Sequence, residues 1–414
     1  MNDSLSFLQI ALRAATVAVV ALLLTACGSD EAPPALDLEA TSWSDIEARA
    51  EGTTVNMAMW TGDPAVNRYM RGYVDSTLRV GYGIDLTISS AQGPQIVSML
   101  MTEQEAGRAR SEFDLLWING ETFYQLRQID ALYGPFLDAL PNRRLLDLDN
   151  RFINTDFQQP IDGYEAPWGN VQFMLITDTT RVPDPPRTRA ELEAWVRQNP
   201  GRFTFDVTFA GMTFLKALLI DIAGGEHVLA GPFDEATYER YSARLWDYIR
   251  RLQPYLWKQG ETFPQGVAQV HQLFATGEVD FTMSNNDGEV DNKVNQGLFP
   301  ETARAYVPDF GSIQNSHYLG IPSHAVDKAA ALVAINVLIS PEAQARKLHP
   351  AVWGDGTVLN RDALPERWQR RFAEAAARTH APPRAAIRDR ALAELAPEYM
   401  IRLYDDFRRE IIER

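Results

Sequence analysis

Aromatic and carboxylate side chains recur together at short spacing in this sequence. The densest group is Tyr164-Glu165-Ala166-Pro167-Trp168-Gly169, which carries two aromatic rings and one carboxylate within five residues. Aromatic faces attract cations, and a carboxylate can balance the charge of a cation held between them. Tyr164, Glu165 and Trp168 are therefore candidates for binding a planar or cationic small molecule. The alternative is that Trp168 only fills space in the core.

Two further groups come directly after predicted strands. Trp60-Thr61-Gly62-Asp63 places a ring beside the start of a helix, where backbone N–H groups are unpaired. Trp117-Ile118-Asn119-Gly120-Glu121 adds an amide, which both donates and accepts, and a glycine that permits close approach. A purely structural interpretation stays open: a core tryptophan, helix caps, and an acid that compensates the helix dipole. The ligand-binding candidates from these groups are Trp60, Thr61, Asp63, Trp117, Asn119, Gly120 and Glu121.

A fourth group, Ser284-Asn285-Asn286-Asp287-Gly288, also ends a predicted strand and is unusually polar. Asn285 and Asp287 are candidates for ligand contact, although Asn-Asp-Gly is also ordinary turn chemistry. Weaker candidates are Thr208, Thr213 and His317, and a lone histidine is more often a hydrogen-bonded structural residue.

Motifs of known catalytic and metal sites are missing from the sequence. There is no G-x-S-x-G, no H-E-x-x-H and no glycine-rich phosphate loop ending in Gly-Lys-Ser/Thr. The six histidines are scattered, without the spacing of paired metal ligands. We therefore expect a binding protein and not an enzyme, with no cofactor and no metal.

The candidate groups need a scaffold that brings strand ends together, and the sequence predicts an α/β one. Predicted strands over 53–60, 83–89 and 113–118 alternate with helices, the first of which is capped by Asp63 and begins at Pro64. Such alternation implies a parallel sheet, in which ligands gather at the carboxyl ends of the strands. The loops 60–63 and 117–121 are thus expected at one edge.

A second α/β unit begins near residue 171. Its predicted strands cover 203–207 and 279–283, and its predicted helices cover 211–223, 234–258 and 263–276. From Lys328 to the end helices dominate, and this tail has no sheet of its own, so it must pack on an earlier one.

Composition and charge narrow the class of protein. The 414 residues are 45% hydrophobic and 10% aromatic, enough for two domains and a substantial core. The formal charge of -16 argues against nucleic acid as a partner, because its phosphates need Lys and Arg. The acidic balance is weakly compatible with a cationic ligand.

The N-terminus indicates export and a lipid anchor. Arg13 precedes an apolar run over 14–24, and Leu24-Thr25-Ala26-Cys27 then places small residues before the only cysteine of the chain. This pattern resembles a lipoprotein signal peptide over 1–26, which leaves Cys27 as the lipidated first residue. The alternatives are a buried thiol or an ordinary secretory signal. Residues 27–49 are predicted to form a flexible tether, and no other segment approaches the roughly 20 apolar residues of a membrane span.

Several segments, in order along the chain, resemble the extracellular solute-binding proteins of ABC importers in the larger two-lobe class. These are Phe274-Ala275-Thr276-Gly277-Glu278-Val279-Asp280, Ile339-Ser340-Pro341-Glu342-Ala343-Gln344 and the stretch 164–169. The stretches 116–121, 162–169 and 199–204 resemble one branch more closely, the binding proteins assigned to thiamine transport.

The resemblance implies a type II-like periplasmic-binding-protein fold with two lobes. Lobe I takes 50–165 and 320–414, lobe II takes 166–319, and hinge crossings lie near 165–172 and 315–322. The expected protein is a lipid-anchored monomer on the periplasmic side of the membrane, which delivers a solute to a permease and its ATPase. A thiamine-like cationic or aromatic solute is favoured over a polyamine or carbohydrate. The alternative of another class is a periplasmic enzyme, or a sensor or scaffold lipoprotein.

Overall fold

The computed structural model describes residues 36–413. The predicted signal peptide, Cys27 and the start of the predicted tether lie outside the described residues. Within the described range, none of the helices combines the length and the apolar character that crossing a bilayer requires.

Lobe I is built on a sheet whose central strands are parallel, as the alternation of elements predicts. β1 (Thr54–Met59) pairs with β2 (Asp85–Ser90) on one side and β3 (Leu115–Ile118) on the other. Helices α3 (Pro64–Arg68), α5 (Gly93–Glu105) and α6 (Gly120–Gln128) follow these three strands. Asp63 caps α3 by accepting hydrogen bonds from Ala65 N and Val66 N. Because β1 and β3 are parallel, the loops that follow them open at the same sheet edge.

Lobe II contains a smaller antiparallel sheet. β7 (Met174–Asp178) lies between β8 (Phe281–Ser284) and β9 (Ala303–Tyr306). The prediction of a strand over 203–207 is wrong, since this segment joins no sheet. Its alternating Phe203 and Phe205 instead pack against Phe214 of α8 (Phe209–Ala223), so burial produces the strand-like pattern without a neighbouring strand.

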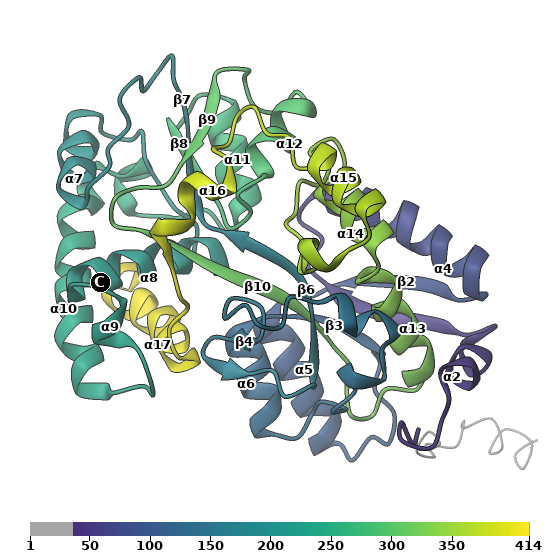
Figure 1. The fold of residues 1–414 in the computed structure, drawn as a ribbon. Helices are drawn as coiled ribbons and strands as arrows, with labels where there is room; N and C mark the ends of the chain where they lie inside the picture. Colours follow the sequence, from purple (N-terminus) through teal and green to yellow (C-terminus); the bar gives the residue numbers. More distant parts are fainter. Residues whose placement is uncertain (1–35, 414) are drawn as a thin grey trace, which may run out of the picture.

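Two long strands connect the lobes. β6 (Glu165–Gln172) and β10 (Ser312–Gly320) pair antiparallel, and Figure 1 shows them running through the middle of the molecule. β10 also pairs with β3 and with the short β11 (Ala391–Leu392). The hinge crossings predicted near 165–172 and 315–322 fall on these two strands and stay a prediction.

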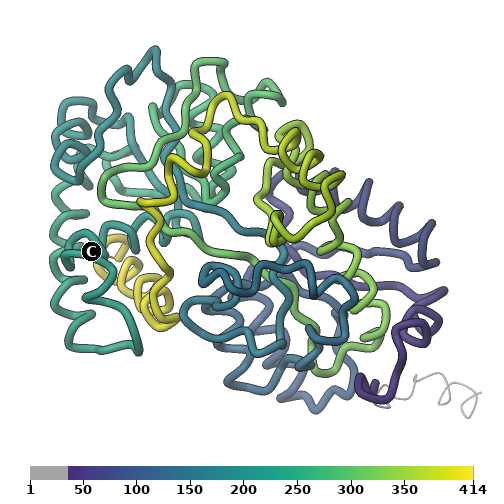
Figure 2. Tube along the Cα trace, viewed as in Figure 1, coloured from purple at the N-terminus to yellow at the C-terminus, as the bar shows by residue number. Residues whose placement is uncertain are grey.

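The C-terminal helix departs from the expected division of the chain. α17 (Pro397–Phe407) buries Met400, Leu403 and Phe407 in the core of lobe II, beside α8 and the aromatic side chains of α10 (Glu235–Leu252). On another side it packs against α6 of lobe I. The expectation that all of 320–414 returns to lobe I therefore does not hold for the last segment. Figure 2 shows the chain crossing back between the lobes before this helix. The apolar face of α17 suits either core, so the sequence pattern alone does not choose the lobe.

The predicted tether also ends earlier than expected. Ser42 caps α2 (Trp43–Ala50), and Ile46 and Ala50 of this helix are buried against α13 (Lys328–Leu338). Residues from Leu36 onward thus belong to lobe I, because apolar side chains in this acidic stretch pack on the core.

The other helices and strands complete the two lobes. In the second unit, α10 stops at Leu252 because Pro254 cannot continue the helical hydrogen bonds, and α11 (Val267–Ala275) begins only after Gly266.

The remaining α-helices are α4 (Asp75–Tyr82), α7 (Arg189–Gln198), α9 (Glu226–Leu229), α12 (Glu289–Asn295), α14 (Pro341–Leu348), α15 (Glu366–Ala375) and α16 (Arg384–Ile387). Tyr69–Val74 and Arg408–Ile412 are π-helical, and β4 (Thr155–Asp156) and β5 (Gln159–Pro160) form a hairpin. Short 3-10 turns cover Leu137–Ala139, Pro141–Leu145, Gln253–Tyr255, Trp257–Gly260, Arg361–Ala363 and Arg388–Arg390.

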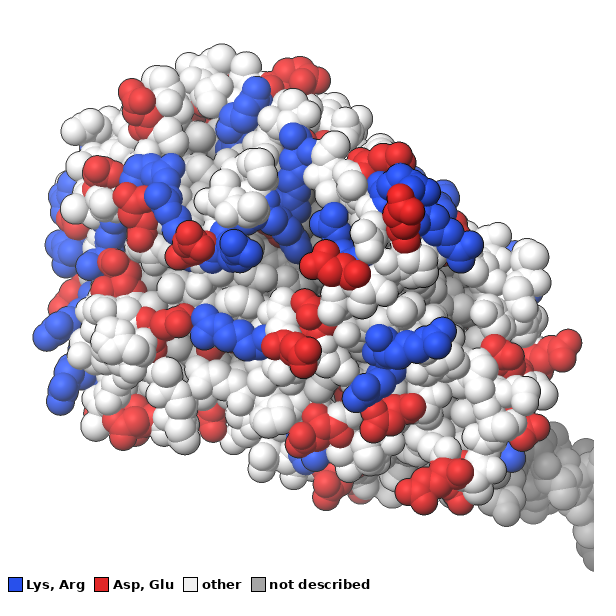
Figure 3. Space-filling view, viewed as in Figure 1, with Lys and Arg blue, Asp and Glu red and all other residues white. Residues whose placement is uncertain are grey.

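Charges of both signs intermingle on the face shown in Figure 3. This arrangement differs from the single-sign basic stripe of a nucleic-acid-binding surface.

Candidate functional site

A cavity of about 480 Å³ opens between the lobes. The loops after β1, β3 and β8 and the start of α8 line it, and β6 and β10 pass beneath it. Eight residues singled out in the sequence line this cavity: Trp60, Asp63, Trp117, Asn119, Glu121, Thr208, Asn285 and His317. Trp60, Asp63, Trp117, Asn119 and Glu121 meet because parallel strands of lobe I place their carboxyl ends at one sheet edge. Thr208 and Asn285 come from lobe II and His317 from β10, so their place in the cavity depends on how the lobes face each other.

The strongest sequence group, 164–169, lies behind the cavity wall and does not line it. Tyr164 stacks beneath the guanidinium of Arg127, 3.4 Å from the ring centroid. Glu165 and Trp168 are fully buried in β6, whose residues are all buried. The pairing of β6 with β10 draws this segment into the protein interior, which the local sequence cannot show.

Asp287 also departs from the expectation of a ligand contact. Its carboxylate is fully buried and forms ion pairs with Arg378 and Arg384 of the C-terminal segment. Burial opposes ionisation, but the two guanidinium groups hold the pKa of Asp287 below its usual range. This carboxylate therefore ties the C-terminal segment to the start of α12.

Three other candidates have local structural roles and do not line the cavity. Thr61 donates a hydrogen bond to Ser90 at 2.7 Å, and Thr213 donates to the backbone oxygen of Phe209 at 2.8 Å. A side chain at Gly120 would overlap the ring of Phe157, so only glycine lets this ring pack against the backbone here.

One wall of the cavity is aromatic. Trp117 and Trp353 lie with ring centroids 5.9 Å apart, and His317 lies 5.0 Å from Trp117. Trp168 supports them from behind, meeting Trp117 edge-on at 5.0 Å. Sequence reasoning missed Trp353, although a tryptophan beside Gly354-Asp355-Gly356, just after a helix, is a weak signal of a similar kind. The wall offers π-faces to a planar or cationic group.

Most carboxylates that line the cavity are paired with cations of the chain itself. Lys293 of α12 forms a buried ion pair with Asp63 across the cleft, and its ammonium lies 3.2 Å from Glu289. Burial acts to raise the pKa of Glu289, but the neighbouring Lys293 and His271 outweigh this effect and hold the pKa below its usual range. Asp355 is paired with Lys347 and lies 3.2 Å from His317.

Glu121 is different. It lies in the first turn of α6, is 5% exposed, and its Oε2 has no hydrogen-bond partner among the described residues. Burial raises the pKa of Glu121 to about 7, against the opposing charge of Lys216. Asn119 Oδ1 and Asn285 Oδ1 are likewise buried acceptors without a partner in the described chain. Three unpaired acceptors around one cavity favour a ligand that donates N–H or O–H groups.

Within residues 36–413, no group of three or more His, Cys, Asp or Glu side chains is placed to hold a metal ion. The lining of the cavity offers π-faces, amide and carboxyl acceptors, and internally paired charges.

A family model for bacterial extracellular solute-binding proteins matches residues 78–374. Protein YnjB of Escherichia coli (strain K12) is 36% identical over 335 residues, which cover 80% of this chain and 86% of that protein.

Solved structures of periplasmic binding proteins share the fold. AfuA from Actinobacillus pleuropneumoniae with fructose-6-phosphate bound has a TM-score of 0.63 at 12% identity, over 87% of this chain and 99% of that one. AgtB from A. tumefacien R10 in complex with agropinic acid has a TM-score of 0.55 at 15% identity, over 87% and 99%. An ABC transporter substrate-binding protein from Bradyrhizobium japonicum USDA 110 has a TM-score of 0.61 at 16% identity, over 86% and 99%. The predicted two-lobe fold is thereby confirmed.

Proposed function

Because the chain belongs to the bacterial extracellular solute-binding protein family, we propose that it captures a small solute between its lobes and delivers it to an ABC importer. The location of the cavity supports this role, since residues of both lobes line it and β6 and β10 connect them. One structural neighbour is itself described as an ABC transporter substrate-binding protein. The partners in this proposal are a permease and its ATPase.

We further propose that the solute is a small cation that carries a planar ring and N–H donors, as thiamine does. The observation that carries this proposal is the pairing of an aromatic wall with three unpaired buried acceptors, Glu121 Oε2, Asn119 Oδ1 and Asn285 Oδ1. The fold itself does not select the solute, because AfuA and AgtB bind chemically different compounds. The two lysines beside the cavity, Lys293 and Lys347, already pair with carboxylates, which disfavours an anionic solute.

A polyamine and a carbohydrate fit the same cavity less completely. A polyamine would satisfy the acceptors but has no ring to cover Trp117 and Trp353. A carbohydrate can lie on the aromatic wall, but its neutral hydroxyl groups would not use the charge that Glu121 can acquire.

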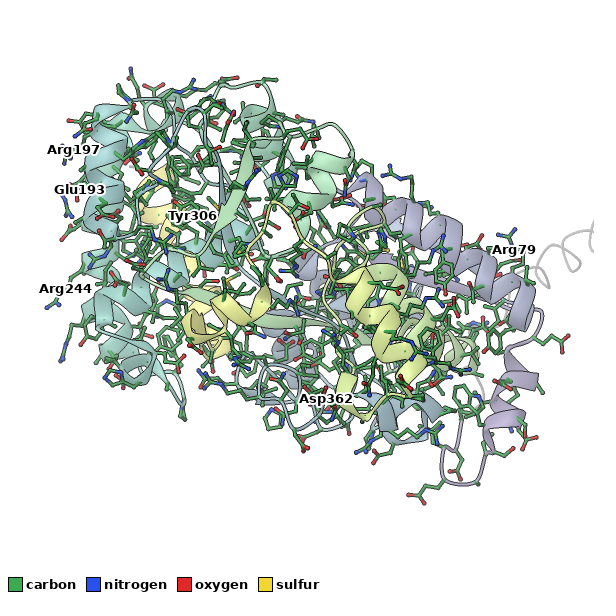
Figure 4. The ribbon with its side chains drawn as sticks, turned by 45° about the horizontal axis from the view of Figure 1, so that its top comes forward. Arg79, Glu193, Arg197, Arg244, Tyr306 and Asp362 are labelled. Atoms are coloured by element: carbon green, nitrogen blue, oxygen red, sulfur yellow. The ribbon has the colours of Figure 1, made fainter. Side chains whose placement is uncertain are left out.

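Calorimetric titration with thiamine tests the class of solute. We expect wild type to bind thiamine and Trp117→Ala to bind it roughly 2- to 30-fold more weakly, because a cation–π contact contributes about 0.5–2 kcal/mol. Arg244→Ala is the control, since Arg244 is exposed at the outer edge of lobe II (Figure 4). Wild-type protein that binds glucose and ignores thiamine would show that the cationic class is wrong.

We also propose that Cys27 anchors the protein to the membrane through a lipid. The support is the apolar run that ends in Leu24-Thr25-Ala26-Cys27, with no other cysteine in the chain. Cys27→Ala should appear in the aqueous fraction after cell fractionation, with the melting temperature of a wild-type fragment that lacks residues 1–27. A processed variant that stays with the membrane would contradict the anchor.

A further inference from the structure

Glu121 stands at the cavity end of a row of buried carboxyl groups. Asp156 of β4 and Glu165 of β6 are 1% and 0% exposed. None of their four carboxyl oxygens makes a hydrogen bond of good geometry to another described residue, although Asp156 faces the N–H of Gly120. Oε2 of Glu121 is equally without a partner, and Glu121 is the member of the row that lines the cavity.

The cations near this row are too few to balance it. Lys216 of α8 is fully buried and forms an ion pair with Glu394, which also accepts a hydrogen bond from Asn315 at 2.7 Å. Arg127 opposes the charge of Glu165 from the far end of the row. Four carboxyl groups thus share one fully buried lysine and one arginine, and ionising all four would leave buried negative charge without compensation.

The groups that face Glu121 come from every element around it. α8 contributes Lys216, the C-terminal segment Glu394, β4 Asp156 and α17 the phenol of Tyr404, which lines the same cavity. The start of α5 contributes the uncharged Gln92 and Gly93. Burial, then the charges of Glu394 and Glu121, raise the pKa of Asp156 well above its usual range, and burial followed by Asp156 does the same to Glu165. Burial and mutual repulsion thus favour the protonated form of these carboxyl groups.

We propose that Glu121 is a carboxylic acid in the empty cleft and gives up its proton when a cationic solute binds. This inference rests on the proposed function, because it assigns the proton exchange to the same cavity. On binding, the O–H bond of Glu121 breaks, its electron pair stays on the carboxylate, and the proton passes to water. The carboxylate then accepts a hydrogen bond from an N–H of the cation, so one positive charge replaces another.

The exchange makes binding dependent on pH in a defined direction. Below the pKa of Glu121 the solute must displace a proton, and above it the carboxylate is already ionised. With that pKa at about 7, the apparent Kd is expected to be roughly tenfold higher at about pH 6 than at about pH 8.5. A neutral solute forms no ion pair with the Glu121 carboxylate, so the proton exchange also favours cationic over neutral solutes.

Calorimetry with thiamine in phosphate and in HEPES measures the proton directly, because the two buffers differ in ionisation enthalpy. We expect wild type to release roughly half a proton near pH 7, since the group is then about half protonated. Glu121→Gln should release none and should lose the tenfold dependence of Kd on pH. Asp362→Asn, at an exposed carboxylate (Figure 4), should behave as wild type.

His317 also lines the cavity, and its imidazole is a second group there that can exchange a proton, so it needs its own variant. The proposal requires that the pH dependence persist in His317→Gln, whatever the affinity of this variant. Loss of the dependence in His317→Gln together with its persistence in Glu121→Gln would overturn the assignment to Glu121.

A measurement without ligand separates this inference from the choice of solute. A carboxyl group with a raised pKa costs the folded state stability as pH rises from the unfolded pKa toward the folded one. Wild type should therefore lose stability over this range and Glu121→Gln should not. The melting temperature of Glu121→Gln minus that of wild type is expected to be larger at about pH 8.5 than at about pH 5. A difference that stays constant over this range overturns the proton exchange. Failure of wild type to bind thiamine, with the increase present, counts against the proposed class of solute alone.

Discussion

At the scale of single residues, two acids in similar loop positions have opposite environments. Glu121 has no cation in ion-pair contact within the described chain, whereas Asp287 is held by Arg378 and Arg384. We predict that Asp287→Asn lowers the free energy of unfolding by about 3 kcal/mol near neutral pH, because it leaves two guanidinium groups without their partner. The loss should shrink as pH falls below about 4, where Asp287 itself becomes protonated in the unfolded chain and its stabilising effect fades. Urea unfolding at several pH values measures both effects.

The control at this scale is Asp309→Asn, because Asp309 pairs with Arg187 and Arg390 while 47% exposed. Surface pairs contribute about 0–1 kcal/mol, so this variant should stay near wild type. Equal losses in the two variants would contradict the structural role of Asp287.

At the scale of elements, α17 contributes to the core of lobe II although it is the last α-helix of the described chain. Leu403 is fully buried there. Leu403→Ala should cost about 3 kcal/mol of stability through the lost transfer free energy and the cavity left behind. Hydrogen exchange in this variant should become faster in α8 and α10, which share the core with Leu403, before it becomes faster in α13 of lobe I.

The control is Ile412→Ala, at a residue that is 51% exposed, which should change stability by about 0.5 kcal/mol or less. Faster exchange in α13 alone would contradict the placement of α17.

At the scale of the whole molecule, the ion pair between Asp63 and Lys293 joins the two lobes across the cleft. We propose that β6 and β10 act as the hinge and that this pair favours the closed arrangement. Lys293→Gln should shift the protein without ligand toward an open arrangement with a larger radius of gyration, because the closed state would leave Asp63 buried without a cation. Small-angle scattering measures the shift, and saturating thiamine should reduce it.

Arg79→Gln is the matched control for scattering, since Arg79 pairs with Asp75 on the outer surface of lobe I, far from the cleft (Figure 4). Identical radii for wild type and Lys293→Gln, each with and without bound thiamine, would argue against a hinge that this pair controls.

The sequence by itself determined the local units of this protein. Asp63-Pro64 predicted the start of α3, because capping by a side chain acts within a few residues. Asn119-Gly120 marked the start of α6 as well, although the side chain of Asn119 makes no capping hydrogen bond. The alternation of strands and helices then required a parallel sheet in lobe I, which placed the loops after β1 and β3 at one edge. Five of the ligand-binding candidates, Trp60, Asp63, Trp117, Asn119 and Glu121, reached the cavity for that reason.

Only the tertiary structure decided which charged groups are paired and which face the cavity. The partners of Asp287 lie 91 and 97 residues away, at Arg378 and Arg384, and no local pattern connects them. Trp353 joins the aromatic wall from the chain that returns to lobe I after β10, while β6 draws Glu165 and Trp168 inward. Ion pairing and burial depend on distances between segments that are remote in sequence, so the role of a carboxylate as ligand group, structural partner or proton carrier emerges only when the chain is folded.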